Sequence, residues 1–280
     1  MQNIIIRLYL LQNKSILGES KKNSEVYINE LEEKIVDLSL RLKGKTSELN
    51  SVRESNTKSI GKLIHNLRNP VGVIFSFTDM ILEDLEEYTP EKLEKHLQII
   101  KNSASFSLEL LTIVAKYSQL QSPNLTYSFQ SLNYTELVND ILNEFNAISV
   151  EKNIKIEREF SKNPISLTID VTEFAVSLRN IINNAFRYSN NNTTIKITIK
   201  ENLNTVETII IDEGIGISED NLPAIFNEFF VVNTYSEDKQ KCIGLGLAIT
   251  NKIIQDHKGT ISVTSLINKG TQIKIILPKK

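Results

Sequence analysis

Two short glycine motifs in the second half of the chain have the residue types of a phosphate-binding site. The first, Asp212–Ile217 (DEGIGI), directly follows an expected strand, and the second, Gly244–Leu247 (GLGL), directly precedes an expected helix. Glycine suits backbone that needs positive φ or lies close to a ligand, and a glycine turn that opens a helix directs free N–H groups outward. Asp212 could accept a hydrogen bond from an adenine amino group. Either motif alone fits an ordinary tight turn, but the two together favour a nucleotide site.

An expected helix from Val171 to Tyr188 adds side chains that suit a metal ion and phosphates. Asn180, Asn184 and Arg187 lie at i, i+4 and i+7, about a third of a turn from the apolar stripe. An amide oxygen can ligate Mg²⁺, and an arginine can neutralise phosphate charge. In isolation this face would be an ordinary solvated one. The apolar stripe consists of Phe174, Leu178, Ile181 and Ala185.

A single histidine, His65, lies in an amphipathic helix expected from Ser59 to Asp84. It falls about 130° from the middle of the apolar stripe, so it points away from the core that this helix builds. Pro70 lacks a backbone N–H and its ring clashes with the carbonyl of Asn66, so a bend is expected just after His65. Alone, this is the pattern of a solvent-facing histidine on a kinked surface helix. The stripe consists of Ile60, Ile64, Leu67, Val71, Ile74 and Ile81.

The residues from about Glu25 to Thr57 are predicted to form a coiled coil. Apolar residues alternate at spacings of three and four, interrupted only by Lys45, and the outer faces are charged. This favours a parallel dimer over one long helix packed on its own domain. After Val52 the apolar row continues in three steps of four, a stutter that either transmits rotation to the His65 helix or is a tolerated irregularity. The row comprises Ile28, Leu31, Ile35, Leu38, Leu42, Leu49 and Val52, followed by Asn56, Ile60 and Ile64.

A second helix is expected after Tyr88, with Thr89 as N-cap and Pro90 at the first helical position. The residues Gln121–Asn124 end it and mark a linker. Two helices joined by a short turn form a hairpin, and two hairpins from two chains make a four-helix bundle. The apolar stripe of this helix consists of Leu93, Leu97, Ile100, Ala104, Leu108, Leu111 and Val114.

The second half mixes helices with a mostly antiparallel sheet. The fold class is therefore α+β: an N-terminal coiled coil and a helical hairpin forming a dimeric four-helix bundle, followed by an α/β two-layer sandwich. The expected helices span 134–150, 171–188 and 244–257, and the expected strands span 154–160, 165–169, 194–201, 206–212, 260–266 and 271–277.

Composition excludes several other classes. The net charge of −2 does not indicate a basic, nucleic-acid-binding protein. One cysteine, Cys242, rules out an intrachain disulfide and disfavours a zinc cluster. No apolar run approaches the ~20 residues that span a bilayer. The run at Met1–Leu11 is interrupted by Arg7 and has no cleavage site, so we expect a soluble, cytoplasmic chain without a signal peptide or membrane insertion.

With these motifs in this order, the chain from about Thr57 onward resembles the sensor histidine kinases of two-component systems, which join a HisKA-type dimerisation hairpin to a Bergerat-type HATPase domain. The other ATPases with this fold, in topoisomerases, chaperones and mismatch repair, lack a histidine-bearing hairpin upstream, as do anti-sigma serine kinases. A purely structural coiled-coil protein would not need the paired glycine motifs. The resemblance is carried by Ile64–Pro70 (IHNLRNP), Asn180–Tyr188 (NIINNAFRY), Asp212–Ile217 (DEGIGI), Ile225–Phe230 (IFNEFF) and Gly244–Ile249 (GLGLAI), and by an ending with HKGTISVTS and GTQIKIILP.

The resemblance implies an ATP- and Mg²⁺-dependent protein histidine kinase that acts as a homodimer. His65 would accept the γ-phosphate of ATP and pass it to an aspartate on the receiver domain of a response regulator, and a separate upstream sensor protein is a further candidate partner. The implied domains are a signalling segment at 1–57, a dimerisation and phosphotransfer hairpin at 58–122 and an ATP-binding catalytic domain at 126–280.

The resemblance also assigns roles within the nucleotide site. Asn184 would ligate Mg²⁺ with Asn180 beside it, and Asp212 would hold adenine. Arg187 and Tyr188 would contact the phosphates. The lining would include Gly214, Gly216, Gly244, Leu245, Gly246 and Leu247, and Lys239 and Lys241 are candidate lid contacts to phosphate.

The chain departs from the family pattern directly after the histidine. The family usually has Glu or Asp there, whereas this chain has Asn66; Asn69, four residues after His65, matches the family and is implied to position the water that dephosphorylates the regulator. An amide can orient the imidazole but carries no charge. We therefore expect a competent but slow kinase, with a phosphatase-dominated or weakly active ATP-binding scaffold as the alternative.

Replacing Asn66 by Asp or Glu is expected to speed phosphorylation of His65, because a general base is typically worth ~10² to 10⁴ in rate. The measurement is the time course of phosphohistidine formation in the wild type and in Asn66→Asp and Asn66→Glu. If neither carboxylate variant is faster, this interpretation of Asn66 is wrong.

Overall fold

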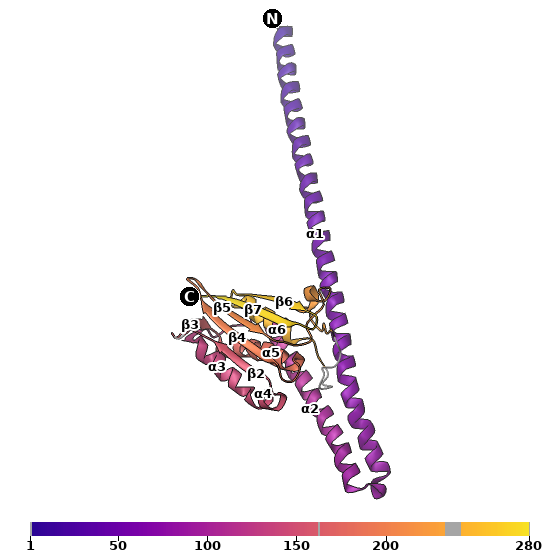
Figure 1. The fold of residues 1–280 in the computed structure, drawn as a ribbon. Helices are drawn as coiled ribbons and strands as arrows, with labels where there is room; N and C mark the ends of the chain where they lie inside the picture. The colour runs from indigo at the N-terminus through magenta and orange to yellow at the C-terminus, as the bar shows by residue number, and fades with distance from the viewer. Residues whose placement is uncertain (1, 162, 233–241, 280) are drawn as a thin grey trace. The chain divides into compact units, whose positions relative to one another are not determined.

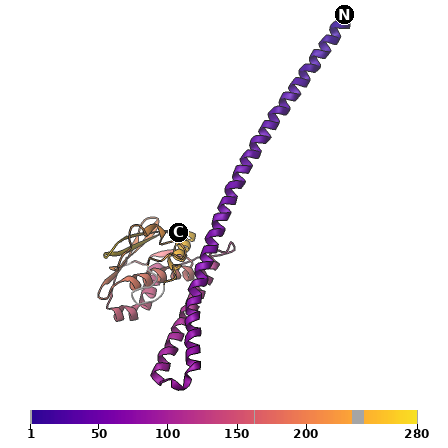
Figure 2. The same cartoon turned by 90° about the vertical axis from the view of Figure 1, so that its right-hand side faces the viewer.

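The computed structural model describes residues 2–161, 163–232 and 242–279; in the first helix, side chains are described at 33–50, 54, 57 and from 60 onward. The chain divides into two compact units, residues 1–61 and 62–280. The first unit belongs to helix α1, Gln2–Glu83 (Figures 1 and 2). Four members of the predicted coiled-coil row are strongly exposed in the single chain, which is consistent with an apolar row that packs against a second helix. The dimer stays a prediction. These residues are Ile35, Leu38, Leu42 and Leu49, at 62%, 63%, 70% and 65% exposure.

The second unit starts with the predicted helical hairpin. After α1 come a 3₁₀ turn, η1 (Leu85–Glu87), and helix α2 (Pro90–Leu120). The expected start of α2 is confirmed: the Thr89 hydroxyl accepts the N–H of Lys92 at 3.3 Å, and Pro90 is the first helical residue. Pro70 lies inside α1 and is buried, and the bend expected beside it stays a prediction.

The hairpin buries only part of its predicted apolar stripe. Leu67, together with Leu63, packs against the core of the second unit. Ile60, Ile64 and Val71 remain 56%, 52% and 49% exposed. The exposed members would be available to a second hairpin. None of the helices in the described part of the chain has the length and apolar character that crossing a bilayer requires.

The rest of the second unit is an α+β domain, as predicted, with a five-stranded sheet in the order β2-β4-β5-β7-β6. Strand β2 is parallel to β4, and the other neighbours are antiparallel. Along β5, Val206, Thr208 and Ile210 are buried while the residues between them are only partly buried, so one face of the sheet carries the core. Helices cover that face (Figure 1). The elements are β2 (Lys155–Glu159), β4 (Thr194–Glu201), β5 (Thr205–Ile211), β6 (Thr260–Leu266), β7 (Gly270–Pro278), α3 (Tyr134–Glu144), α4 (Asn146–Lys152), α5 (Val171–Tyr188), η2 (Leu222–Ala224) and α6 (Gly246–Asp256).

Two features differ from the sequence prediction. The helix expected over 134–150 is two helices, α3 and α4, with a break at Phe145, whose ring stacks on Phe186 at 5.4 Å between centroids. A small sheet also pairs β1 (Gln130–Asn133) with β3 (Ser166–Ile169). The sequence signal for β1 is weak because the strand has only four residues and three of them are polar.

A buried polar pair joins the helical layer to the sheet. The Tyr134 side chain is 0% exposed, and its hydroxyl lies 2.7 Å from the hydroxyl of Thr208 in β5, which is 1% exposed. A buried hydroxyl that loses its partner costs the free energy of desolvation without a compensating hydrogen bond. The pair therefore fixes the start of α3 against the centre of the sheet.

Tyr134→Phe is expected to lower the free energy of unfolding by about 1–3 kcal/mol, because it leaves the Thr208 hydroxyl buried without this partner. Tyr134→Phe combined with Thr208→Val should cost less than the sum of the two single changes, because the double variant leaves neither partner unpaired. Urea unfolding followed by circular dichroism tests this. Additive losses would show that the two hydroxyls do not depend on each other.

Candidate nucleotide-binding site

Helix α5 is held in place by a cap at its start and a side-chain contact in its middle. The carboxylate of Asp170 accepts the N–H of Glu173 at 3.0 Å, which satisfies one of the free donors of the first turn. Further along, the amide of Asn180 donates to the carbonyl of Gly246 at 3.1 Å and to the Thr250 hydroxyl at 3.4 Å. Asn180 therefore ties α5 to the first turns of α6.

Most of the predicted nucleotide-site residues line one cavity in the second unit. They come from α5, from the end of β5 and from the glycine loop that opens α6. Two predicted residues do not line it: Gly214, and Leu245, whose side chain is 0% exposed and lies in the core. Their predicted part in nucleotide binding stays untested. The lining residues that the sequence predicted are Asn180, Asn184, Arg187, Tyr188, Asp212, Gly216, Gly244, Gly246 and Leu247.

Asp212 is a buried carboxylate fixed by backbone donors. Its Oδ1 accepts the N–H groups of Gly214 at 2.9 Å and of Thr271 at 3.1 Å. Both bonds end on Oδ1, so Oδ2 is left for a ligand in the cavity. Burial raises the pKa of Asp212 to about 6, although the two backbone hydrogen bonds oppose that shift. This carboxyl group can accept a hydrogen bond from an adenine amino group.

Two glycines are required by the backbone around this site. Gly244 has a φ of +75°, and a Cβ there would lie 2.6 Å from the carbonyl oxygen of Phe230. Gly270 has a φ of +99°, and a Cβ there would lie 1.9 Å from the carbonyl oxygen of Asp212. The positive φ of Gly244 also explains why α6 begins at Gly246 and not at Gly244 as predicted. In the sequence, Gly270 falls within the C-terminal motif GTQIKIILP, and no local signal connects it to Asp212.

The cavity also has a wall that the sequence analysis missed. The hydroxyl of Tyr188 lies 3.2 Å from Sγ of Cys242, and burial raises the pKa of that hydroxyl. Apolar side chains of the sheet complete the wall, and their alternation pattern does not distinguish a cavity lining from ordinary core. The missed lining residues include Ile210, Val263, Thr271, Ile273, Cys242 and Ile243.

The hairpin contributes α2 to the cavity wall and not His65. Glu109 and Ile113 of α2 line the cavity, whereas His65 is exposed and does not. Asn66 and Asn69 are likewise absent from the lining. The structure therefore does not bring the predicted phosphoacceptor to the predicted nucleotide site. Lys239 and Lys241 lie outside the described residues.

Polar contacts hold α2 beside this domain. Lys116 forms an ion pair with Glu173 in the first turn of α5, and the hydroxyl of Tyr117 donates to the carboxylate of Glu228. Burial and the Glu228 hydrogen bond raise the pKa of Tyr117. In α1, Nζ of Lys62 donates to the carbonyl of Phe229 at 3.4 Å. The segment IFNEFF, which carries Glu228, is thus a contact point for both helices of the hairpin.

The donor set fits Mg²⁺ bound together with phosphates. Asn184 presents an amide to the cavity near Arg187. Mg²⁺ is commonly held by one or two protein ligands together with waters and substrate phosphates. In the part of the chain that the structure describes, no group of three or more His, Cys, Asp or Glu side chains could hold a metal ion.

Comparisons with known proteins agree with this geometry. Residues 169–280 match the family described as histidine kinase-, DNA gyrase B- and HSP90-like ATPases. Over 254 residues the chain is 22% identical to the sensor histidine kinase YvrG of Bacillus subtilis, covering 91% of this chain and 44% of YvrG. Over 218 residues it is 29% identical to the sensor protein KdpD of Clostridium acetobutylicum, covering 77% of this chain and 24% of KdpD. The chain spans less than half the length of these curated relatives.

Solved structures show the same likeness. The histidine kinase ThkA in complex with the response regulator protein TrrA matches with a TM-score of 0.67 and 26% identity, covering 84% of this chain and 66% of that chain. The histidine kinase AdeS of Acinetobacter baumannii shares the fold, with a TM-score of 0.60 at 20% identity over 77% of this chain and 98% of that chain. Along most of its length the chain resembles two-component sensor histidine kinases, and its C-terminal part is a Bergerat-type ATPase domain.

The pKa of Asp212 gives a pH test of adenine recognition. Below about pH 6 the carboxyl gains a proton and becomes a weaker acceptor, so adenosine binding should weaken on the order of tenfold between about pH 7.5 and about pH 5. Adenosine is the probe because it has no phosphate to titrate. Calorimetry on the wild type and Asp212→Asn measures this. The variant should bind weakly at both pH values, and an equal pH dependence in both proteins would contradict the assignment.

Proposed function

We propose that this chain is an ATP-dependent autophosphorylating protein histidine kinase with His65 as the phosphoacceptor. The observation that carries the proposal is the single cavity in which Asn184, the fixed carboxylate of Asp212 and the glycine loop at Gly244 converge. The exposure of His65 on the preceding hairpin supports it as an acceptor. The proposed domains are 1–57 for signalling, 58–122 for dimerisation and phosphotransfer, and 126–280 for ATP binding and catalysis.

In this proposal each side of the cavity has one task. Asp212 accepts the adenine amino group, and the first turn of α6 directs N–H groups at the phosphates. Arg187 and Tyr188 contact the phosphates, and Asn184 holds Mg²⁺. When bound, Mg²⁺ neutralises phosphate charge during transfer.

The transfer step uses the neutral imidazole of His65. One ring nitrogen attacks the γ-phosphorus, a P–N bond forms, and the bond from phosphorus to the β–γ bridging oxygen breaks. ADP leaves with that electron pair, and the opposite ring N–H loses its proton to water. Asn66 orients the ring without taking the proton, which makes the step slow.

The proposal includes a change in the hairpin contacts. Glu109 and Ile113 of α2 line the cavity, whereas His65 does not. His65 reaches the phosphates either when its own hairpin shifts or when a partner chain supplies it. A homodimer is supported by the exposed apolar residues of α1, among them Ile60 and Ile64.

The partners follow from the same proposal. The neighbouring structure of ThkA with TrrA supports a response regulator receiver domain as the acceptor of the phosphoryl group. A separate sensor protein is a candidate source of the signal. Asn66 favours the alternative function, a phosphatase-dominated or weakly active scaffold that binds ATP and accumulates almost no phosphohistidine.

Incubation with γ-labelled ATP and Mg²⁺ tests the proposal. Wild type is expected to acquire acid-labile, alkali-stable label, and His65→Gln is expected to lose it because the acceptor nitrogen is gone. The matched control is His96→Gln, which changes the other histidine of the hairpin, whose Nδ1 lies 2.8 Å from the hydroxyl of Tyr88. Label that persists in His65→Gln would refute His65 as acceptor. Nucleotide binding without label in the wild type would support the scaffold.

A further inference from the structure

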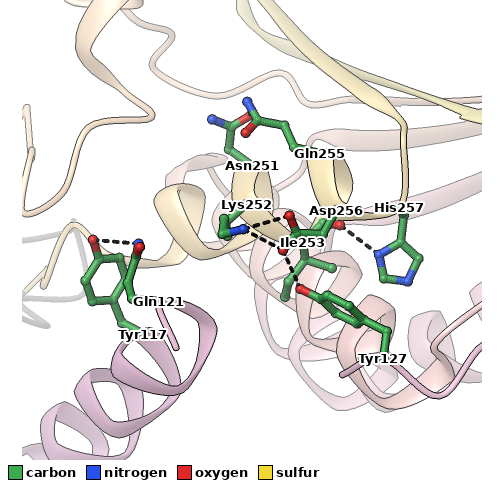
Figure 3. Close-up of polar contacts among 9 residues, drawn as sticks. All are labelled: Tyr117, Gln121, Tyr127, Asn251, Lys252, Ile253, Gln255, Asp256 and His257. Carbon is green, nitrogen blue, oxygen red and sulfur yellow. Dashed lines mark hydrogen bonds and ion pairs between the residues drawn. The ribbon is translucent and has the colours of Figure 1, made fainter. Parts of the chain in front are cut away.

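His257, directly after α6, is buried outside the nucleotide cavity and uses both ring nitrogens. It is 5% exposed and does not line the cavity. Its Nδ1 lies 2.7 Å from the carbonyl oxygen of Ile253 (Figure 3), and its Nε2 lies 3.0 Å from the backbone N–H of Asp170. Because a carbonyl can only accept, Nδ1 carries the proton and Nε2 accepts. The ring is therefore a neutral imidazole in one tautomer, and burial lowers its pKa.

Asp170 connects this histidine to the helix that carries Asn184. Its Oδ1 caps α5 through the N–H of Glu173 at 3.0 Å. Its Oδ2 accepts the N–H of Ser128 at 2.7 Å, and its own N–H goes to His257. One residue thus joins the linker at Ser128, the start of α5 and the end of α6.

The linker segment Tyr127–Phe129 packs against the same point. The hydroxyl of Tyr127 donates to Oδ2 of Asp256 at 2.7 Å, and Nζ of Lys252 lies 2.7 Å from both carboxylate oxygens (Figure 3). The rings of Tyr127 and Phe129 each lie 5.1 Å from the ring of His257. The imidazole is therefore buried and packed against two aromatic rings.

Helices α5 and α6 are consequently tied together at two points. Asn180 holds the carbonyl of Gly246 at the start of α6, and His257 holds the N–H of Asp170 at the start of α5. Asn184 lies one turn beyond Asn180 on α5. Loss of a contact made directly to a metal ligand typically lowers metal affinity about 10- to 100-fold, and the contact at Asp170 acts on Asn184 through the helix between them.

We propose that His257 is a positioning residue for the nucleotide site, which fixes the start of α5 through the Asp170 N–H and so places Asn184 for Mg²⁺ and phosphate. The inference rests on the proposed function of this site. In this inference, different parts of the site bind the two ends of the nucleotide. Asp212, on the strand side of the cavity, holds adenine independently of His257. Disturbing His257 should therefore weaken binding of the phosphate end and leave binding of the base unchanged.

Two substitutions of His257 isolate the hydrogen bond to Asp170. Glutamine can place an amide oxygen near the position of Nε2 and keep the acceptor, whereas asparagine reaches only the position of Nδ1. If the Nδ1 bond is lost, the Ile253 carbonyl still has a hydrogen-bond donor, because it also accepts the backbone N–H of His257 at 3.0 Å. Loss of the Nε2 bond leaves the Asp170 N–H buried without this acceptor.

The test is calorimetric binding of Mg²⁺-ATP and of adenosine to the full chain. His257→Asn is expected to weaken Mg²⁺-ATP binding about tenfold or more with unchanged adenosine binding, and His257→Gln to retain most of the wild-type affinity. His96→Asn and His96→Gln are the matched controls and should alter neither. Equal affinities in all variants, or equal losses for both ligands, would overturn the proposal. A wild type that binds neither ligand would instead refute the proposed function.

Hydrogen exchange of the wild type covers the case in which His257→Asn does not fold. Because coupling between two sites is reciprocal, Mg²⁺-ATP should slow exchange of the Asp170 amide and of the first turn of α5 more than adenosine does. Equal protection by the two ligands would contradict the positioning role.

Discussion

The burial of the Asp212 carboxylate is the constraint on which the nucleotide site depends. A buried carboxylate needs donors, and here two backbone N–H groups on one oxygen supply them, one from the turn after β5 and one from the start of β7. That arrangement requires the antiparallel pairing of Ile211 with Gln272, and it requires Gly270, because any Cβ there would collide with the backbone of Asp212. This anchoring leaves the second carboxylate oxygen for a ligand, whereas the raised pKa comes from burial and is opposed by the two hydrogen bonds.

The α5–α6 layer supplies the other side of the same cavity. Two hydrogen bonds between a side chain and a backbone group hold this layer together: Asn180 donates to the carbonyl of Gly246, and His257 accepts from the N–H of Asp170. The backbone partner in each bond is the same whatever side chain stands at that position. In the proposed function, the sheet side of the cavity holds the base and the helix pair holds the phosphates. The two parts are joined through the core, in which Ile181, Ile210 and Ile249 are buried.

The sequence predicted the elements with strong periodicity and missed those determined by distant contacts. Helix α5 has the predicted bounds because its apolar stripe and the carboxylate before it agree. Phe145 interrupts a continuous helical pattern because its ring stacks on Phe186, far away in the sequence. The motifs predicted nine of the lining residues, yet Gly270 and Cys242 were not linked to the site, and His257 was noted only within a motif. These residues act through partners 54 to 87 positions away, and a local pattern does not reveal such partners: Gly270 meets Asp212, Cys242 meets Tyr188, and His257 meets Asp170.

If His65 is to reach a phosphate, the hairpin has to move. The segment of the chain that allows this movement can be identified. The segment from Tyr127 to Phe129 is bound to the start of α5 and the end of α6, so the freedom lies before it, in Gln121–Asn124, whose described hydrogen bonds are all local. The contact that must break includes Lys116 and Glu173. Only one oxygen of that carboxylate has a partner among the described residues; the other, Oε2, is buried without one. A buried unpaired oxygen costs about 1–3 kcal/mol, so this contact contributes less to holding the hairpin than a fully paired one would. The same ion pair lies in the turn capped by Asp170, so release of the hairpin removes a contact from the start of α5, the point that His257 keeps fixed.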